Sequence, residues 1–151
     1  MIIRAARNDE ALTLTQLAFD SKRYWGYDDD FMERCRSELV VREEDITQGN
    51  VFVSVDETDG DVTGVYILKT LSDSLAELDM LFVAPPRIGD GVGAALVAHA
   101  IDLARATGHA TMRIDADPFA AAFYEHQGAV LVGTSTSVST GRELPTYEFR
   151  L

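Results

Sequence analysis

Apolar and polar residues alternate along the chain with two different periods, and each change of period marks a predicted element. The first predicted helix carries apolar residues at helical intervals, namely Ala11, Leu14, Leu17 and Ala18. We expect it to begin after an N-cap at Asn8 or Asp9 and to end near Asp20. A second helix, from about residue 28 to residue 38, presents a stripe made of Phe31, Met32, Cys35 and Leu39.

β-rich runs occupy the middle of the chain. Residues 51–55 and 62–68 form a predicted hairpin around the polar turn at residues 57–61, and a short strand at residues 2–5 precedes them. The run from Leu75 to Val83 alternates with a period of two. One face holds Leu78, Met80 and Phe82, and the other holds Glu77, Asp79, Leu81 and Val83.

A long helix is predicted over residues 91–107, and a strand over residues 110–115. Asp117 and Pro118 then provide an N-cap and a first helical position for a short helix that ends at Gly128. Residues 129–133 and 146–151 complete the chain as strands. A meander of strands followed by one strand–helix–strand crossover unit is typical of an α/β protein with a mixed sheet covered by helices. A length of 151 residues suits one domain.

Three glycines, Gly89, Gly91 and Gly93, lie between the strand and the long helix. Backbone N–H groups at a helix start lack partners and carry partial positive charge, so this loop is suited to binding a phosphate. The spacing also fits a dinucleotide fingerprint, with Asp115 as the later acidic residue, although too few βα units follow. A strand-to-helix turn without a ligand is the remaining alternative.

Composition narrows the classes of function. A formal net charge of −12 argues against binding to nucleic acid. Acidic clusters at residues 28–30 and 43–45 are interpreted as helix starts, and binding of a cationic acceptor is the alternative explanation for them. Cys35 is the only cysteine and fits a core position better than a nucleophile, and the histidine spacing predicts no metal site. With no apolar run long enough for a membrane, we expect a cytoplasmic protein.

The motifs between residues 77 and 128 resemble those of the GNAT superfamily of N-acetyltransferases, and the order of elements agrees over the whole chain. The shared features are the strand ending in Val83-x-Pro85, the glycine loop, the long helix, and the segments Asp117-Pro-Phe-Ala120 and Phe123-Tyr-Glu-His-Gln-Gly128. The resemblance implies an α/β (α+β) fold with a mixed, mostly antiparallel central sheet of about seven strands, flanked by about four helices.

This resemblance also implies acetyl-CoA as cofactor, with its pyrophosphate on the loop written [QR]xxGx[GA]. Here Ile88 replaces the leading Gln or Arg, Asp90 adds a carboxylate, and Arg87 is a candidate to supply the missing charge. The backbone of Leu81 and Val83 is expected to bond the pantetheine arm. The predicted cofactor-binding residues are Leu81, Phe82, Val83, Arg87, Ile88, Gly89, Asp90, Gly91, Val92, Gly93, Ala94, Asp117, Ala120 and Phe123.

Two catalytic residues follow from the same resemblance. Tyr124 matches the tyrosine that protonates the leaving thiolate, which suits a phenol with a pKa of about 10, and a buried aromatic role is the alternative. Glu77 is the predicted base that takes a proton from the acceptor amine, with Asp79 as the second candidate, and solvation of both carboxylates is the alternative.

Substrate contacts are predicted on two segments. Tyr24, Trp25 and Tyr27 lie between the first two helices and Arg142 lies near the C-terminal strands, and with Asp79 they form the predicted substrate-binding set. Trp25 could instead complete the core. The predicted partners are acetyl-CoA and a primary amine of a small molecule or peptide, with a homodimer possible. A catalytically idle acyl-CoA sensor is the alternative function, and a dinucleotide binder is a third.

Overall fold

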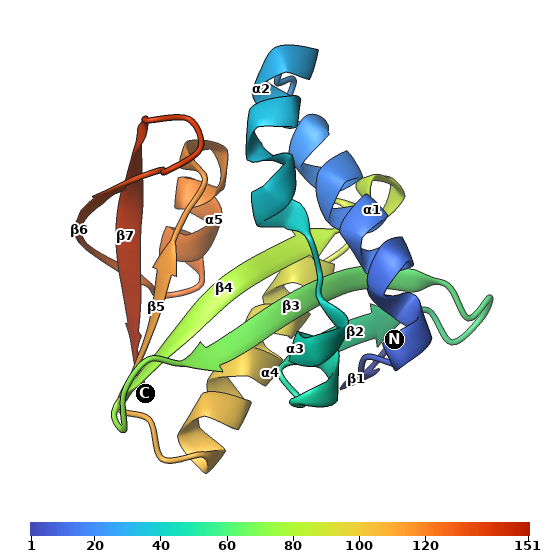
Figure 1. The fold of residues 1–151 in the computed structure, drawn as a ribbon. Coiled ribbons are helices and arrows are strands. Elements are labelled where there is room, and N and C mark those ends of the chain that lie inside the picture. The colour runs from blue at the N-terminus through green and yellow to red at the C-terminus, as the bar shows by residue number, and fades with distance from the viewer. The chain divides into compact units, whose positions relative to one another are not determined.

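Seven strands and five α-helices, joined by short 3₁₀ segments, make up the computed structural model, which describes residues 1–151 (Figure 1). The strands are β1 (Ile2–Ala5), β2 (Val51–Val55), β3 (Val62–Thr70), β4 (Leu75–Val83), β5 (Thr111–Asp115), β6 (Val130–Thr136) and β7 (Glu143–Arg150). The helices are α1 (Ala11–Arg23), α2 (Asp29–Cys35), α3 (Glu43–Thr47), α4 (Val92–Ala106) and α5 (Ala121–His126).

The seven strands form one sheet in the order β1-β2-β3-β4-β5-β7-β6. Strand β4 pairs in parallel with β5, whereas the pairs β1–β2, β2–β3, β5–β7 and β6–β7 are antiparallel. The mixed, mostly antiparallel sheet predicted from the sequence is therefore confirmed.

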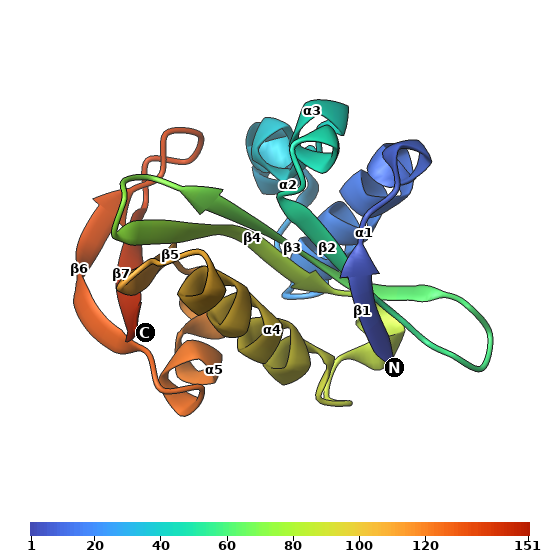
Figure 2. The same cartoon turned by 90° about the horizontal axis from the view of Figure 1, so that it is seen from below.

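Contacts divide the chain into two compact units. Unit 1 comprises Met1–Ile67 and Met80–Leu96, and unit 2 comprises Leu68–Asp79 and Val97–Leu151. In unit 1, α1, α2 and α3 lie on one side of strands β1 to β3, and the start of α4 lies on the other side (Figure 2). Both faces of these strands are therefore covered, as their long apolar runs require.

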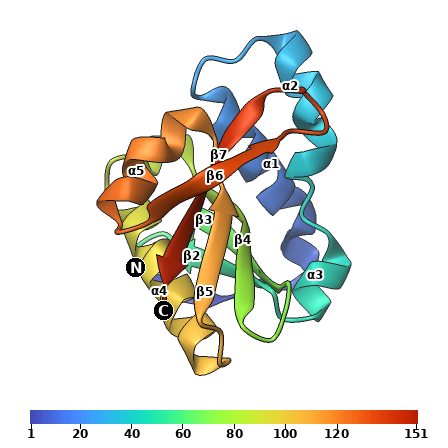
Figure 3. The same cartoon turned by 90° about the vertical axis from the view of Figure 1, so that its left-hand side faces the viewer.

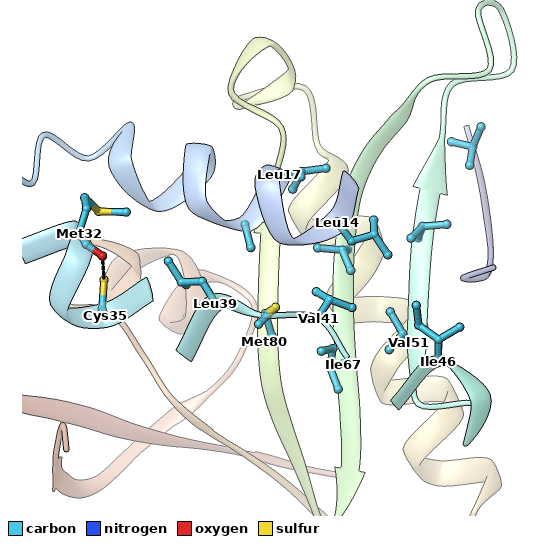
Figure 4. Packing of buried hydrophobic residues seen from close by; sticks show 14 residues of the cluster. Leu14, Leu17, Met32, Cys35, Leu39, Val41, Ile46, Val51, Ile67 and Met80 are labelled. Carbon is cyan, nitrogen blue, oxygen red and sulfur yellow. Dashed lines mark hydrogen bonds between the residues drawn. The ribbon is translucent and has the colours of Figure 1, made fainter. Parts of the chain in front are cut away.

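The core of unit 1 lies between these helices and the sheet (Figure 4). Leu14 and Leu17 from α1 and Met32 and Cys35 from α2 pack here with Met80 from β4. These helix positions belong to the two stripes that the hydrophobic pattern predicts. Cys35 is 1% exposed, so its predicted place in the core is confirmed.

In unit 2, α5 lies beside β7 on the buried face of the β5–β7–β6 ribbon (Figure 3). Met112 and Ile114 of β5 pair in register with Phe149 and Tyr147 of β7, and all four side chains are buried. Arg113, between Met112 and Ile114 in β5, points to the opposite face of the sheet, because successive side chains of a strand alternate between faces.

Both acidic clusters lie at helix starts, as predicted. Asp28 is the N-cap of α2 and its carboxylate accepts a hydrogen bond from the Phe31 N–H at 2.8 Å. Residues 43–45 form the first turn of α3, a five-residue helix that the pattern did not predict. No helix is long and apolar enough to cross a membrane.

The entry to α1 differs from the prediction. Residues 8–10 form a 3₁₀ turn capped by Arg7, so the expected N-cap at Asn8 or Asp9 is wrong. Glu10 accounts for this geometry, since its carboxylate accepts a hydrogen bond from the Arg7 N–H at 2.7 Å and also binds the Arg4 guanidinium. The helix continues to Arg23 rather than ending near Asp20.

Candidate active site

The glycine loop leads from a 3₁₀ turn at Pro85–Arg87 into α4. Gly89 and Gly91 have φ angles of +92° and +84°, which side-chain-bearing residues rarely adopt. A Cβ added at either glycine would meet no atom within 4 Å, so the backbone conformation, and not crowding, requires glycine there. The loop surface on that side is open.

The hydrogen-bond ladder of α4 begins after this loop. In its first turn, the Ala95 N–H donates to the Gly91 carbonyl at 3.1 Å. The N–H groups of Val92, Gly93 and Ala94 therefore precede the ladder, as at any helix N-terminus. Val92 is 6% exposed and anchors this turn to the sheet, while Asp90 is exposed. The arrangement is suited to holding an anion near the loop.

Arg87, the predicted source of positive charge for the loop, is engaged by the β2–β3 turn. Its guanidinium lies 2.6 Å from the Asp56 carboxylate and 3.3 Å from that of Asp59. The Asp56 carboxylate raises the pKa of Arg87, which keeps its full charge. Two carboxylates therefore compete with any anionic ligand for this side chain.

In unit 2, Glu77 lies on β4 and has charged neighbours on β3, β4 and β5. Burial raises the pKa of Glu77, and the negative charges of Asp79 and Asp115 raise it further. The Lys69 ammonium acts in the opposite direction and lies 3.4 Å from the Asp79 carboxylate. A carboxyl with a raised pKa is a better base than an exposed one, so the prediction for Glu77 has a physical basis.

A cleft of about 340 Å³ opens beside Glu77 within unit 2. Its polar lining is formed by Glu77, Arg113, Asp115, Thr134, Ser135 and Thr146. The register places Glu77 opposite Arg113, whose guanidinium binds the Glu148 carboxylate at 3.0 Å. Asp115 accepts a hydrogen bond from the Thr146 hydroxyl at 2.6 Å. Glu77, a carboxyl with a raised pKa, thus borders a polar cleft.

Tyr124 is buried on α5, at 3% exposure. Its ring packs edge-to-face against Phe123, with centroids 5.0 Å apart, and against Phe149 at 6.5 Å. Burial raises the pKa of Tyr124, and the nearby Asp117 charge adds to the effect. The phenol therefore stays protonated at neutral pH, and its raised pKa makes it a weaker acid than a free tyrosine.

Asp117 closes the turn before α5. One carboxylate oxygen accepts a hydrogen bond from the Phe119 N–H at 2.9 Å, so the predicted N-cap is confirmed. Its other oxygen lies 3.1 Å from Arg142, which the sequence assigned to substrate binding. Arg142 therefore has a protein carboxylate as a partner.

The family model described as Acetyltransferase (GNAT) family matches residues 13–129. The chain belongs to the GNAT acetyltransferase family. Its glycine loop, Glu77 and Tyr124 all fall within the matched residues. Family membership replaces the dinucleotide interpretation of the loop, because the loop belongs to a GNAT domain and not to a doubly wound one. No curated protein is similar enough in sequence to count as a match.

Solved structures share this GNAT fold. The PaiA N-acetyltransferase of Thermoplasma acidophilum, in complex with coenzyme A, is 20% identical with a TM-score of 0.81, covering 99% of this chain and 98% of that one. The ribosomal-protein-alanine N-acetyltransferase of Brucella melitensis is 24% identical with a TM-score of 0.71 and full coverage of both chains. YncA, a putative acetyltransferase of Salmonella typhimurium with acetyl-CoA, is 21% identical with a TM-score of 0.71, covering 99% and 93%. At these identities the likeness establishes the fold alone.

Among the predicted substrate residues of this GNAT chain, the aromatic ones differ in environment. Tyr24 and Trp25 are 58% and 39% exposed and meet edge-to-face, with ring centroids 6.5 Å apart. Tyr27 stacks on Phe31 at 4.1 Å and packs against the core of unit 1. Trp25 thus retains an accessible face, whereas Tyr27 has a clear packing role. Contact with a substrate stays a prediction for all three.

Several residues of the cleft were not predicted from the sequence. Arg113 of β5 lines the cleft and pairs with Glu148 of β7, and Thr134 and Ser135 of β6 also line it. The period-two pattern of residues 111–115 places Arg113 and Asp115 on one face, which was an available signal. The β6 hydroxyls gave no signal, because β6 was predicted to end at Gly133 and in fact continues to Thr136.

Proposed function

We propose that this GNAT protein transfers an acetyl group from acetyl-CoA to a primary amine by direct attack. The observation that carries the proposal is the partly buried Glu77, whose pKa is raised by burial and by neighbouring carboxylates where it borders a polar cleft. An amine of pKa about 10.4 is protonated at neutral pH, and it must lose that proton to become a nucleophile. Glu77 is the base in this proposal, and Asp79 contributes to its proton affinity.

The glycine loop supports acetyl-CoA as the donor. It offers an open surface, two glycines in a conformation that other residues rarely adopt, and a helix start that favours phosphate. Two similar structures have coenzyme A or acetyl-CoA bound. In the proposal, residues 88–94 hold the pyrophosphate through backbone N–H groups, with Leu81, Phe82 and Val83 beside the pantetheine arm.

The proton and electron balance of the reaction is simple. The amine gives one proton to Glu77, directly or through water, and its lone pair attacks the thioester carbonyl carbon. The C–N bond forms, the C–S bond breaks with its electron pair on sulfur, and Tyr124 donates its proton to that thiolate. The nitrogen then loses its second proton, which returns Tyr124 to the neutral phenol, and Glu77 passes the proton that it accepted to solvent. The leaving thiol titrates near pH 8.5, which is below the pKa of the phenol. Tyr124 is therefore a workable proton donor only once the sulfur carries a full negative charge. The products are an amide and coenzyme A.

A measurement of thiol release tests the proposal. Purified protein is mixed with acetyl-CoA and a panel of primary amines, and liberated coenzyme A is followed with a thiol reagent. We expect release that depends on the amine, a loss of kcat of about 10²-fold or more in Glu77→Gln, and a comparable loss in Tyr124→Phe. Glu143→Gln, at an exposed position of β7, serves as a charge-matched control on the same sheet. Release that is insensitive to both variants would contradict the assigned roles.

An acyl-CoA-binding protein without turnover is the second candidate function. The pairing of Arg87 with Asp56 and Asp59 favours it, because the loop then lacks a side-chain cation for the diphosphate. The same assay separates the two candidates. Protection against thermal unfolding by coenzyme A, with no thiol release for any amine, would support the second candidate and exclude the first.

A further inference from the structure

The two carboxylate oxygens of Asp117 have different partners. Oδ1 accepts the hydrogen bond from the Phe119 N–H, which fixes the first turn leading to α5. Oδ2 lies 3.1 Å from Nη2 of Arg142, in the loop between β6 and β7. The side chains of Arg142 and Asp117 are 27% and 15% exposed, so the pair is shielded from solvent on most sides. Such a charge-assisted bond is stronger than one between exposed side chains.

The loop that carries Arg142 is itself organised. The Ser137 N–H donates to the Arg142 carbonyl at 2.8 Å, and the Gly141 N–H donates to the Ser137 carbonyl at 2.8 Å. Gly141 has a φ of +73°, which allows the tight return. These bonds hold the backbone of Arg142 in place, so the ion pair with Asp117 requires ordering of the Arg142 side chain alone.

Asp117 is connected to Tyr124 in two ways. The 3₁₀ turn Pro118–Ala120, which Asp117 caps, continues directly into α5, where Tyr124 lies one turn further on. The Asp117 charge also acts on the buried phenol and strengthens its hold on its proton. A phenol that holds its proton more tightly is a poorer acid for a thiolate. The positive charge of Arg142 beside Asp117 offsets the effect of the carboxylate on the Tyr124 phenol.

On this basis we propose that Arg142 is a positioning residue for Tyr124, acting through Asp117, and does not bind the acceptor. The inference rests on the proposed acetyl transfer, in which Tyr124 is the acid. It reassigns Arg142, which the sequence placed with the substrate-binding residues. The cation keeps the cap of α5 in place and balances the carboxylate that would otherwise hinder proton donation.

A double-mutant cycle tests this assignment. Arg142→Met removes the charge and keeps the apolar stem of the side chain. Asp117→Asn removes the carboxylate charge while keeping an oxygen that accepts the Phe119 N–H. In the wild-type background we expect Arg142→Met to lower kcat about tenfold, with KM for the amine within about twofold. In the Asp117→Asn background the same change is expected to alter kcat less than about twofold.

Arg142→Lys provides the conservative variant and should recover most of the kcat lost in Arg142→Met, because it restores the cation. A merely structural ion pair would shift the unfolding temperature and leave kcat of the folded protein unchanged, which would overturn the proposal. A rise of KM for the amine that is equal in both backgrounds would also overturn it, since Arg142 would then bind the acceptor.

Failure of this inference is distinguishable from failure of the proposed function. If the wild-type protein releases no thiol with any amine, the proposed function fails. The same four proteins then report through their free energies of unfolding. Absence of coupling between Arg142→Met and Asp117→Asn in that measurement would overturn the link to α5 independently of activity.

Discussion

At the scale of single residues, the protonation of Glu77 is set by its neighbours. The side chain is partly buried, two carboxylates repel its charge, and one ammonium attracts it. The direction of each contribution follows from its sign, because negative neighbours favour the neutral acid and positive neighbours favour the carboxylate. Substitution of these neighbours therefore changes the pH at which Glu77 becomes a base.

We expect opposite shifts from two neighbours of Glu77. Asp79→Asn removes a negative charge, lowers the pKa of Glu77 and moves the acidic limb of the kcat/KM profile to lower pH. Lys69→Met removes a positive charge and moves that limb to higher pH. The profile is measured by thiol release between about pH 4 and 9, the range in which a shifted carboxyl titrates.

Asp73→Asn is the control, since this exposed residue is not among the groups that act on Glu77. Its profile should coincide with that of the wild type. If Asp79→Asn and Lys69→Met moved the acidic limb in the same direction, another group would be responsible for it.

At the scale of elements, α4 packs closely on β3 at the start of the helix, where the glycine loop ends. A Cβ at Gly64 of β3 would lie 2.8 Å from Leu96 Cδ1 and 3.0 Å from Val92 Cγ1, both on α4. Ser54 Oγ of β2 would be 2.9 Å away. These side chains are buried, so they have little room to move.

Gly64→Ala is therefore expected to lower the free energy of unfolding by about 1–3 kcal/mol, as overpacked cores generally do. Denaturant titration measures this change. Gly133→Ala is a suitable control, because a Cβ there meets no atom within 4 Å and its φ is not positive. Equal stability of Gly64→Ala and wild type would mean that α4 is free to shift away from the sheet.

The β2–β3 turn is a second element that bears on the loop. Asp56 and Asp59 hold Arg87 while also accepting hydrogen bonds from the Thr58 and Asp61 N–H groups of their own turn. Asparagine at both positions would keep the turn bonds and release the guanidinium. We expect the double variant Asp56→Asn, Asp59→Asn to bind coenzyme A more tightly, seen as a larger thermal shift at equal ligand concentration.

The matched control is Asp61→Asn combined with Asp73→Asn, which changes the net charge equally without touching Arg87. An equal gain of affinity in the control would attribute the effect to overall charge. No gain in either protein would indicate that Arg87 does not reach the diphosphate.

The sequence predicted elements better than it predicted ionic partners. Hydrophobic periodicity placed β4 over residues 75–83, and the cap formed by Asp117 followed from local chemistry. The partners of Arg87 and Arg142 were not predictable, because Asp56 and Asp117 lie 31 and 25 positions away and only folding brings them near. Short α3 was missed because five residues give no clear period.

At the scale of the whole molecule, net charge opposes the ligand that the family implies. The chain carries a formal charge of −12, and coenzyme A is itself an anion. Long-range repulsion of this kind is screened by salt, with a Debye length of about 10 Å at 0.1 M. Arrangement of the chain as one domain over residues 1–151 stays a prediction.

We therefore expect coenzyme A to associate faster as ionic strength rises from about 0.01 to 0.15 M, in contrast to ligands steered by attraction. Stopped-flow measurement of the association rate constant checks this, with uncharged pantetheine as the control whose rate should not change. A rate that falls steeply with salt would instead indicate a local cationic entrance near the loop.

Cys35 has a practical consequence for every assay based on thiol detection. The side chain is almost fully enclosed, and its Sγ lies 3.5 Å from the Met32 carbonyl oxygen. Because no other cysteine exists in the chain, the native protein adds almost no background colour to a coenzyme A readout. A slow rise in signal from the protein without acetyl-CoA or amine would report transient opening of α2, so one reagent measures both product formation and local unfolding.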